Sequence, residues 1–359
     1  YFCGEHVFQP CEPCEASELV HFRNRIGESG IELILKESIR VNGNDSNDST
    51  ASIDTTVQEK NITFPTDSKL HRKIIDKCRN IAEKENLPVR QSYTRTLKKL
   101  SLDQRFRNHP RNKWKARKAD RKEKTIAGRL VRELERNLSP DSRYQSDIDL
   151  FKRTLNQKKS DKNKIYSVHE PDVQCISKGK EHKKYEFGNK VSIIYTQTTG
   201  VIIGALGFRN PYDGHTIEPA LEQTERLLGK RTLKTLIGDR GYKGKRQIND
   251  TTIEIPKPFN NRKQSQYQQN KLKKQFRKRA AIEPINGHLK TDHRLNRNFY
   301  KGITGDNINV MLAAAAFNFK RMMNKWKSSF GLEFKIQIVD LIKAMFYQIN
   351  NNIIRKWAF

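Results

Sequence analysis

Two β-type segments joined by a short polar turn limit most strongly how this chain can fold. They are Tyr185–Tyr195 (YEFGNKVSIIY) and Val201–Phe208 (VIIGALGF), and TQTTG lies between them. Aromatic and β-branched residues on both sides of a short turn are typical of an antiparallel hairpin. A helical pattern follows from Thr216 to Gly229, and Thr232–Gly238 and Thr252–Ile255 are further short strands. This order of hairpin, helix and strands predicts a domain of the α/β class.

A further strand and a long basic region are predicted before the hairpin. Ala51–Val57 has β-type residues around Asp54. Pro65 then begins a helix whose apolar residues recur at helical spacing. Arg95–Arg136 also has a helical pattern, and its 16 Lys or Arg against 5 acids give +11 in 42 residues. Such a run is either a solvent-exposed helix face or a surface that binds the phosphates of a nucleic acid. It therefore indicates affinity for nucleic acid and does not indicate a catalytic site.

The charge of the whole chain indicates a polyanionic partner, with nucleic acid as the first choice. The 70 Lys and Arg against 40 Asp and Glu give a formal net charge of +30, and Lys257–Lys301 contributes a second +11. The longest apolar run, Val310–Phe317, has eight residues, whereas ~20 are needed to span a bilayer. No secretory signal is recognisable, and five irregularly spaced cysteines fit a reducing compartment. We therefore expect a cytoplasmic, nucleoid-associated protein that does not bind membranes.

Three acids stand where a metal site for phosphoryl transfer requires them. Asp54 lies on the first predicted strand, Asp239 ends a later strand, and Glu283 lies on a following helix. Two Mg²⁺ or Mn²⁺ ions about 3.5–4 Å apart can hold the attacking and leaving oxygens of an in-line displacement. Mg²⁺ prefers a few carboxylates together with water and phosphate oxygens. We therefore expect these three acids to be the catalytic residues and the metal ligands.

The segment Phe276–Lys290 (FRKRAAIEPINGHLK) carries the most informative local pattern. On one continuous helix, Phe276, Arg279, Glu283 and Lys290 fall within about 60° of one another. That face combines an aromatic ring to stack on a base, two cations for phosphates and one acid for a metal. Pro284 weakens the assumption of continuity, because the residue before a proline is biased away from helix, and it places Glu283 at a helix start or kink.

These residues resemble the bacterial insertion-sequence transposases that have an RNase H-like DDE catalytic domain. The signature of that family is Tyr, two residues, Arg, three residues, Glu, six residues, Lys, and here Phe276 replaces the tyrosine and lacks its hydroxyl. DRGYKG at Asp239–Gly244 is similar to the second-acid motif of the family. HEPDVQCISKGKEHKKYEFGNKVSI, NPYDGHT and INVMLAAAAFNFKRMMNKW also look like this group. The resemblance extends from about Tyr1 to Lys327.

The resemblance implies a fold and a domain plan. The fold is an RNase H-like mixed sheet flanked by helices, with a long helical insertion at about 66–165 after the first strand. Residues 1–45 would be the remnant of an N-terminal helical DNA-binding region, 46–327 the catalytic domain, and 328–359 a C-terminal amphipathic helix. The chain, which begins at Tyr1, is then expected to be truncated at its N-terminus.

The implied activity is metal-dependent end cleavage and strand transfer of an insertion sequence. Double-stranded DNA, as element ends and target, is the implied partner, and a homo-oligomer is expected in the DNA complex. Arg240, Phe276, Arg279 and Lys290 are the expected DNA-binding residues.

Several alternatives stay open at this point. Asp172 in HEPDVQC is the rival of Asp54 as first acid, and Asp213, next to Gly214, is expected to be a turn residue or to begin a helix. A metal-dependent nuclease of the same fold and a catalytically inactive DNA-binding remnant are the alternative functions.

Overall fold

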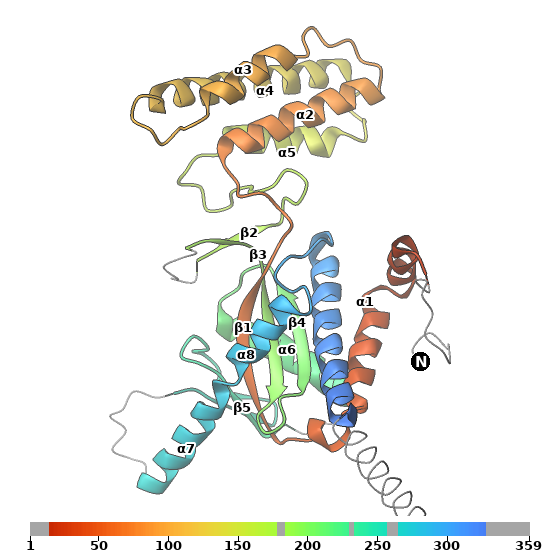
Figure 1. The fold of residues 1–359 in the computed structure, drawn as a ribbon, viewed down its shortest axis with the longest axis vertical. Coiled ribbons are helices and arrows are strands. Elements are labelled where there is room, and N and C mark those ends of the chain that lie inside the picture. Colours follow the sequence, from red (N-terminus) through yellow and green to blue (C-terminus); the bar gives the residue numbers. More distant parts are fainter. Residues whose placement is uncertain (1–13, 178–183, 230–232, 257–264, 328–359) are drawn as a thin grey trace, which may run out of the picture. The chain divides into compact units, whose positions relative to one another are not determined.

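The strands of the protein form one mixed β-sheet that is flanked by helices (Figure 1). The structure is a computed structural model, and it describes residues 14–177, 184–229, 233–256 and 265–327. The sheet order is β2-β3-β1-β5-β7-β6, and β4 pairs with β3. Its strands are β1 (Thr50–Glu59), β2 (Gln174–Ile176), β3 (Glu186–Thr196), β4 (Ile202–Phe208), β5 (Thr235–Ile237), β6 (Gln247–Ile248) and β7 (Thr251–Glu254).

The strand directions are those of the expected RNase H-like fold. β1, β5 and β7 run parallel to one another, whereas β2 pairs antiparallel with β3 and β6 pairs antiparallel with β7. Only five residues separate β3 from β4, so this pair is the predicted hairpin. The prediction of the hairpin and of the first strand is confirmed, and β2 and β6 are short strands that the pattern did not indicate.

Up to residue 291, eight α-helices and two 3-10 turns are assigned in the described residues. They are α1 (Ala16–Arg40), α2 (Asp67–Lys84), α3 (Thr94–Asp103), α4 (Lys113–Asn137), α5 (Gln145–Asn156), α6 (Ile217–Leu228), α7 (Gln266–Arg279) and α8 (Ile282–Thr291), with 3-10 turns η1 (Gly43–Ser46) and η2 (Asp213–Thr216). Residues 302–327 are also helical. The helix predicted within 328–359 lies outside the described residues. No described helix is long and apolar enough to cross a membrane.

The chain divides into two compact units. The sheet unit comprises residues 1–56, 191–296 and 304–359, and the helical unit comprises 57–190 and 297–303. Four helices of the helical unit, α2 to α5, follow β1 directly in the chain, as the predicted insertion requires. The assignment of residues 1–45 to DNA binding stays a prediction.

The helical unit has a hydrophobic core of its own. Side chains at helical spacing on α2, such as Leu70, Ile74 and Cys78, are buried against apolar residues of α4 and α5. Burial raises the pKa of the Cys78 thiol to about 12. The acid Glu123 on α4 is fully buried in this unit, where Arg72 forms an ion pair with it. The predicted basic helix is interrupted at residues 104–112, between α3 and α4.

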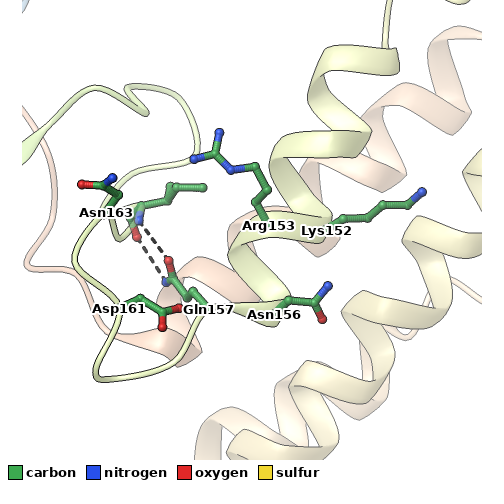
Figure 2. A pocket seen from close by; sticks show the side chains of 7 residues that line it. Lys152, Arg153, Asn156, Gln157, Asp161 and Asn163 are labelled. Carbon is green, nitrogen blue, oxygen red and sulfur yellow. Dashed lines mark hydrogen bonds between the residues drawn. The ribbon is translucent and has the colours of Figure 1, made fainter.

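A surface hollow of about 340 Å³ lies beside α5 in the helical unit (Figure 2). Gln157 closes one side of it, because its side chain exchanges two hydrogen bonds with the backbone of Ile165, at 2.9 and 3.3 Å. Amide and cationic side chains such as Asn156 and Arg153 line the rest. The hollow contains none of the predicted site residues.

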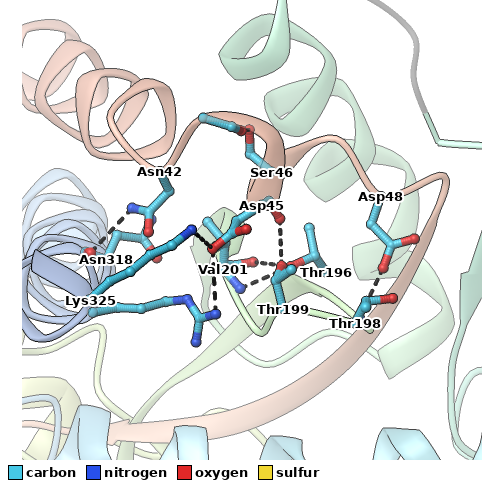
Figure 3. Close-up of polar contacts among 12 residues, drawn as sticks. Asn42, Asp45, Ser46, Asp48, Thr196, Thr198, Thr199, Val201, Asn318 and Lys325 are labelled. Carbon is cyan, nitrogen blue, oxygen red and sulfur yellow. Dashed lines mark hydrogen bonds and ion pairs between the residues drawn. The ribbon is translucent and has the colours of Figure 1, made fainter. Parts of the chain in front are cut away.

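Polar side chains hold the hairpin of the sheet unit in place (Figure 3). Asp48 Oδ2 accepts a hydrogen bond of 2.9 Å from the backbone N–H of Thr198, in the turn. The fully buried Asn318 amide donates to the Ile202 carbonyl at 2.8 Å and accepts from the Ile202 N–H at 3.0 Å. These two bonds give partners to the backbone N–H and carbonyl of Ile202, as buried polar groups require.

The close packing of α6 on β4 gives a testable prediction. A Cβ at Gly204 would lie 2.3 Å from Thr224 Oγ1 on α6, so only glycine fits there without a shift. We expect Gly204→Ala to lower the free energy of unfolding by about 1–3 kcal/mol. Thr224→Ala should restore part of the loss in the double variant, because it removes the clashing oxygen. Urea unfolding of the four proteins measures both effects, and equal stability of Gly204→Ala and the parent would contradict the packing.

Candidate active site

Asp54 lies in β1, and Asp239 follows the end of β5, the parallel neighbour of β1, by two residues. Ser52 of β1 is in register with Ile237 of β5, and each aspartate follows its strand partner by two residues. Because side chains alternate along a strand, a step of two keeps Asp54 on the same face of β1 as Ser52. The pairing of β1 with β5 therefore brings the strand that carries Asp54 next to the strand end that precedes Asp239, although the two acids are 185 residues apart in the chain.

A third carboxylate, Asp213, lies close to the same place. It begins η2, and its Oδ1 accepts a hydrogen bond of 3.0 Å from Oγ1 of Thr55, the neighbour of Asp54. The fully buried Tyr242 is near all three acids: burial, followed by the negative charges of Asp54, Asp213 and Asp239, raises its pKa well above the usual range. Asp213 therefore begins a helix, as predicted, and also belongs to this carboxylate cluster.

The absence of a side chain at Gly241 permits this arrangement. Its backbone N–H donates a hydrogen bond of 2.7 Å to Asp239 Oδ1. A Cβ on Gly241 would lie 2.9 Å from Asp239 Oδ1 and 3.1 Å from Asp213 Oδ2. The sum of these distances limits the separation of the two carboxylate oxygens to 6.0 Å. Gly241 thus both orients Asp239 and leaves room for two acids.

Asp54 is held from the opposite side by the α7–α8 region. Arg279 Nη1 lies 3.4 Å from Asp54 Oδ1, and the Asn286 amide donates to Asp54 Oδ2 at 3.1 Å. The Tyr195 hydroxyl donates to the Arg279 carbonyl oxygen at 2.9 Å and so fixes the last residue of α7. Arg279 was expected to bind DNA, and in this structure its guanidinium balances the charge of Asp54.

The expected continuous helix from Phe276 to Lys290 is two helices. α7 ends at Arg279 and α8 begins at Ile282, so Glu283 lies in the first turn of α8, as the proline signal indicated. Glu283 is exposed, and it precedes Asn286 by three residues, which places both on one side of α8. Within the part of the chain that the structure describes, the Glu283 side chain makes no hydrogen bond or ion pair with Asp54 or Asp239. Within the described residues, no three His, Cys, Asp or Glu side chains are grouped closely enough to hold a metal ion.

The remaining predicted residues lie around these acids or apart from them. Arg240 is exposed directly after Asp239, whereas Phe276 on α7 and Lys290 on α8 are half-buried. Asp172, the rival first acid, is exposed in the turn before β2 and belongs to the helical unit.

Three residues of the site, Gly241, Tyr242 and Asn286, were not predicted from the sequence. Gly241 and Tyr242 stand inside DRGYKG, whose charged residues gave no sign that the tyrosine is buried. Asn286 had no signal of its own beyond its position three residues after Glu283.

A mixed sheet flanked by helices, with Asp54 in β1 and Asp239 two residues after the neighbouring parallel strand β5, is consistent with an RNase H-like fold. Residues 164–319 match the model of the transposase DDE domain family. Asp213, Asp239 and Glu283 lie within the matched residues, and Asp54 precedes them.

One curated relative is similar to part of the chain. It is the "Uncharacterized protein ORF8 in nfe locus" of Rhizobium meliloti, which is 38% identical over 116 residues. The aligned part is 31% of this chain and 56% of the relative. The chain thus spans about half the length of the curated relative that it matches. No solved structure matches the chain.

The close approach at Gly241 leads to a second prediction. If these carboxylates act in DNA cleavage, Gly241→Ala should lower its rate roughly a hundredfold, because displacing catalytic groups by about 1 Å has an effect of this size. Gly287→Ala on α8 is the matched control, since in the described part of the chain nothing lies within 4 Å of a Cβ there. Initial cleavage rates of the two variants measure the difference. Full activity of Gly241→Ala would show that the two carboxylates need not approach each other.

Proposed function

We propose that this chain is a transposase that cuts DNA at the ends of an insertion sequence and joins the freed ends to target DNA. The observation that carries the proposal is the parallel pairing of β1, which contains Asp54, with β5, which ends two residues before Asp239, together with the match of residues 164–319 to the transposase DDE domain. The net charge of +30 supports double-stranded DNA as the partner. A homo-oligomer that holds two DNA ends is part of the proposal.

The donor chemistry of the site fits divalent metal ions. Asp54, Asp239 and Asp213 offer only oxygen ligands, which Mg²⁺ and Mn²⁺ prefer. Burial, and after it the negative charges of Asp54, Asp213 and Asp239, raise the pKa of Tyr242, and a cation bound at these acids would offset their charge. Asp54, Asp239 and Glu283 are the proposed ligands of two ions, with Asp213 as an additional acid of the site. Bound there, the ions would stabilise the charge that develops on the phosphate and on its attacking and leaving oxygens.

The residues of the chain have distinct proposed roles. The Gly241 N–H and the Thr55 hydroxyl orient Asp239 and Asp213. Asn286 and Arg279 orient Asp54, and Arg279 is the group that compensates its charge before an ion binds. The exposed Arg240 and the cation of Lys290 are proposed to hold DNA phosphates, which positions the DNA and does not select its sequence.

A cut-and-join assay tests the proposal and separates it from its alternatives. The donor plasmid carries a marker between the DNA segments that flank the gene, and a second plasmid serves as target. With Mg²⁺ we expect cut ends and joined products, and EDTA should abolish both. Cut ends without joined products would favour a nuclease, and DNA binding without cutting would favour an inactive remnant.

A further inference from the structure

Two large aromatic side chains are exposed at one corner of the helical unit. The corner consists of the turn at residues 104–112 and the first two turns of α4, and we name it the aromatic corner. Phe106 is 80% exposed and Trp114 is 60% exposed. Aromatic side chains in water forgo the favourable free energy of burial. Phe106 and Trp114 lie within nine residues of one another in the chain, and the helical unit has a well-formed core elsewhere.

The aromatic corner is surrounded by cations. Residues 104–124 contain ten Lys or Arg and two acids, a net charge of +8. Both acids are engaged inside the unit, because Asp120 pairs with Arg107 and the buried Glu123 pairs with Arg72. Lys118 Nζ lies 6.0 Å from the centroid of the Trp114 ring. The cations left on the exposed side are Arg105, Arg111, Lys113, Lys115, Arg117, Lys118, Arg121, Lys122 and Lys124.

The backbone of the turn holds Phe106 in a strained conformation, although its side chain is not buried. Phe106 has a φ of +52°, in the left-handed region that a bulky residue rarely adopts. The turn is nevertheless fixed, since the Phe106 carbonyl accepts from the His109 N–H at 2.9 Å and the His109 carbonyl accepts from Asn112 at 3.0 Å. Backbone strain is found most often at ligand-binding and active sites. At Phe106 this strain is not accompanied by burial of the ring, which is typical of such a site.

We infer that the aromatic corner binds unstacked bases of DNA, with Phe106 and Trp114 stacking on the bases and the surrounding cations binding the phosphates. Aromatic rings interleaved with cations are the chemistry by which proteins hold single-stranded nucleic acid. Base faces are hidden in a regular duplex, so the rings select single-stranded or distorted DNA. The inference rests on the proposed function for its partner. It places the aromatic contact on the helical unit, whereas the sequence suggested the half-buried Phe276.

Binding of two DNA probes without divalent metal tests this inference. Fluorescence anisotropy compares a labelled 20-residue oligothymidylate with a duplex of equal length for the parent and for Phe106→Ala/Trp114→Ala. We expect the double variant to bind the single strand at least about tenfold more weakly, since base stacking on aromatic rings contributes at this level. Its affinity for the duplex should change less than twofold.

Trp326→Ala is the matched control, because Trp326 is 53% exposed and stands between Lys325 and Lys327 in the sheet unit. It should leave both affinities unchanged. A second readout is tryptophan emission, which oligothymidylate should quench in the parent and less in Trp114→Phe, although Trp114→Phe keeps its affinity. Phe106→Gly, which removes the strain, should melt no lower than the parent, whereas a structural role of the ring predicts a lower melting temperature.

The outcomes separate the inference from the proposed function. If the parent binds both probes and the double variant keeps its affinity for the single strand, the aromatic corner does not bind bases, as expected for a protein partner, and the proposed function stands. An equal loss of affinity for both probes would also overturn base stacking. If the parent binds neither probe, the proposed function fails together with the inference.

Discussion

Asp54→Asn and Asp239→Asn are each expected to lower DNA cleavage at least about a thousandfold, which corresponds to ~4 kcal/mol in the activation free energy. Each change keeps the shape of the side chain and removes the charge that a divalent ion needs. Affinity for DNA should stay within about threefold, because the cations that bind phosphate are distributed over other residues. Single-turnover cleavage in Mg²⁺ and a binding titration measure the two quantities separately.

Asp172→Asn is the control for this pair. Asp172 is the rival first acid from the sequence, and the structure places it in an exposed turn before β2. We expect this variant to cleave at the parental rate. If Asp172→Asn abolished cleavage and Asp54→Asn did not, the first acid would be Asp172 and the register of β1 and β5 would have no catalytic meaning.

Glu283→Gln should reduce cleavage as strongly as the two aspartate variants, and Asp213→Asn should reduce it by only about tenfold. Glu283 lies on the side of α8 whose Asn286 already contacts Asp54, and in our proposal it is a metal ligand. Asp213 is held by Thr55 and supplies additional charge. An exposed acid in the first turn of a helix also favours that helix terminus by about 0.3–1 kcal/mol, so thermal melting must accompany the kinetics.

The loss of cleavage in Glu283→Gln relative to that in Asp213→Asn shows which of the two residues is the third acid. If Asp213→Asn lost cleavage a thousandfold and Glu283→Gln stayed active, Asp213 would be the third metal-binding acid in place of Glu283. Parental activity in both variants would contradict a site of three carboxylates. Glu218→Gln, in the first turn of α6, is a matched control for changing an exposed helix-terminal acid.

Much of the sheet unit follows from local sequence patterns. The hairpin is local, because β-type residues on both sides of a short turn can pair only with each other at low entropic cost. The end of α6 is local as well, since Gly229 adopts a φ of +67° that other residues avoid. These elements were predicted nearly at the observed bounds for this reason.

The assembly of the candidate site depends on contacts that no local pattern contains. Asp213 was predicted to be in a turn or at a helix start, which is its backbone role, yet its carboxylate bonds to Thr55, 158 residues earlier. The break between α7 and α8 likewise redirects Arg279 from a shared helical face to Asp54. Pro284 indicated the break, but the direction in which Arg279 points depends on packing against β1.

Iron-directed cleavage of the protein chain tests most directly whether these carboxylates bind divalent ions. Fe²⁺ replaces Mg²⁺ in the protein, and ascorbate with hydrogen peroxide then generates radicals that cut the backbone next to the bound ion. We expect cuts near residues 54, 239 and 283, with a weaker cut near 213, all suppressed by excess Mg²⁺ and lost in Asp54→Asn/Asp239→Asn. Cuts confined to other residues, or cuts at these residues that excess Mg²⁺ leaves unchanged, would contradict the proposed metal site.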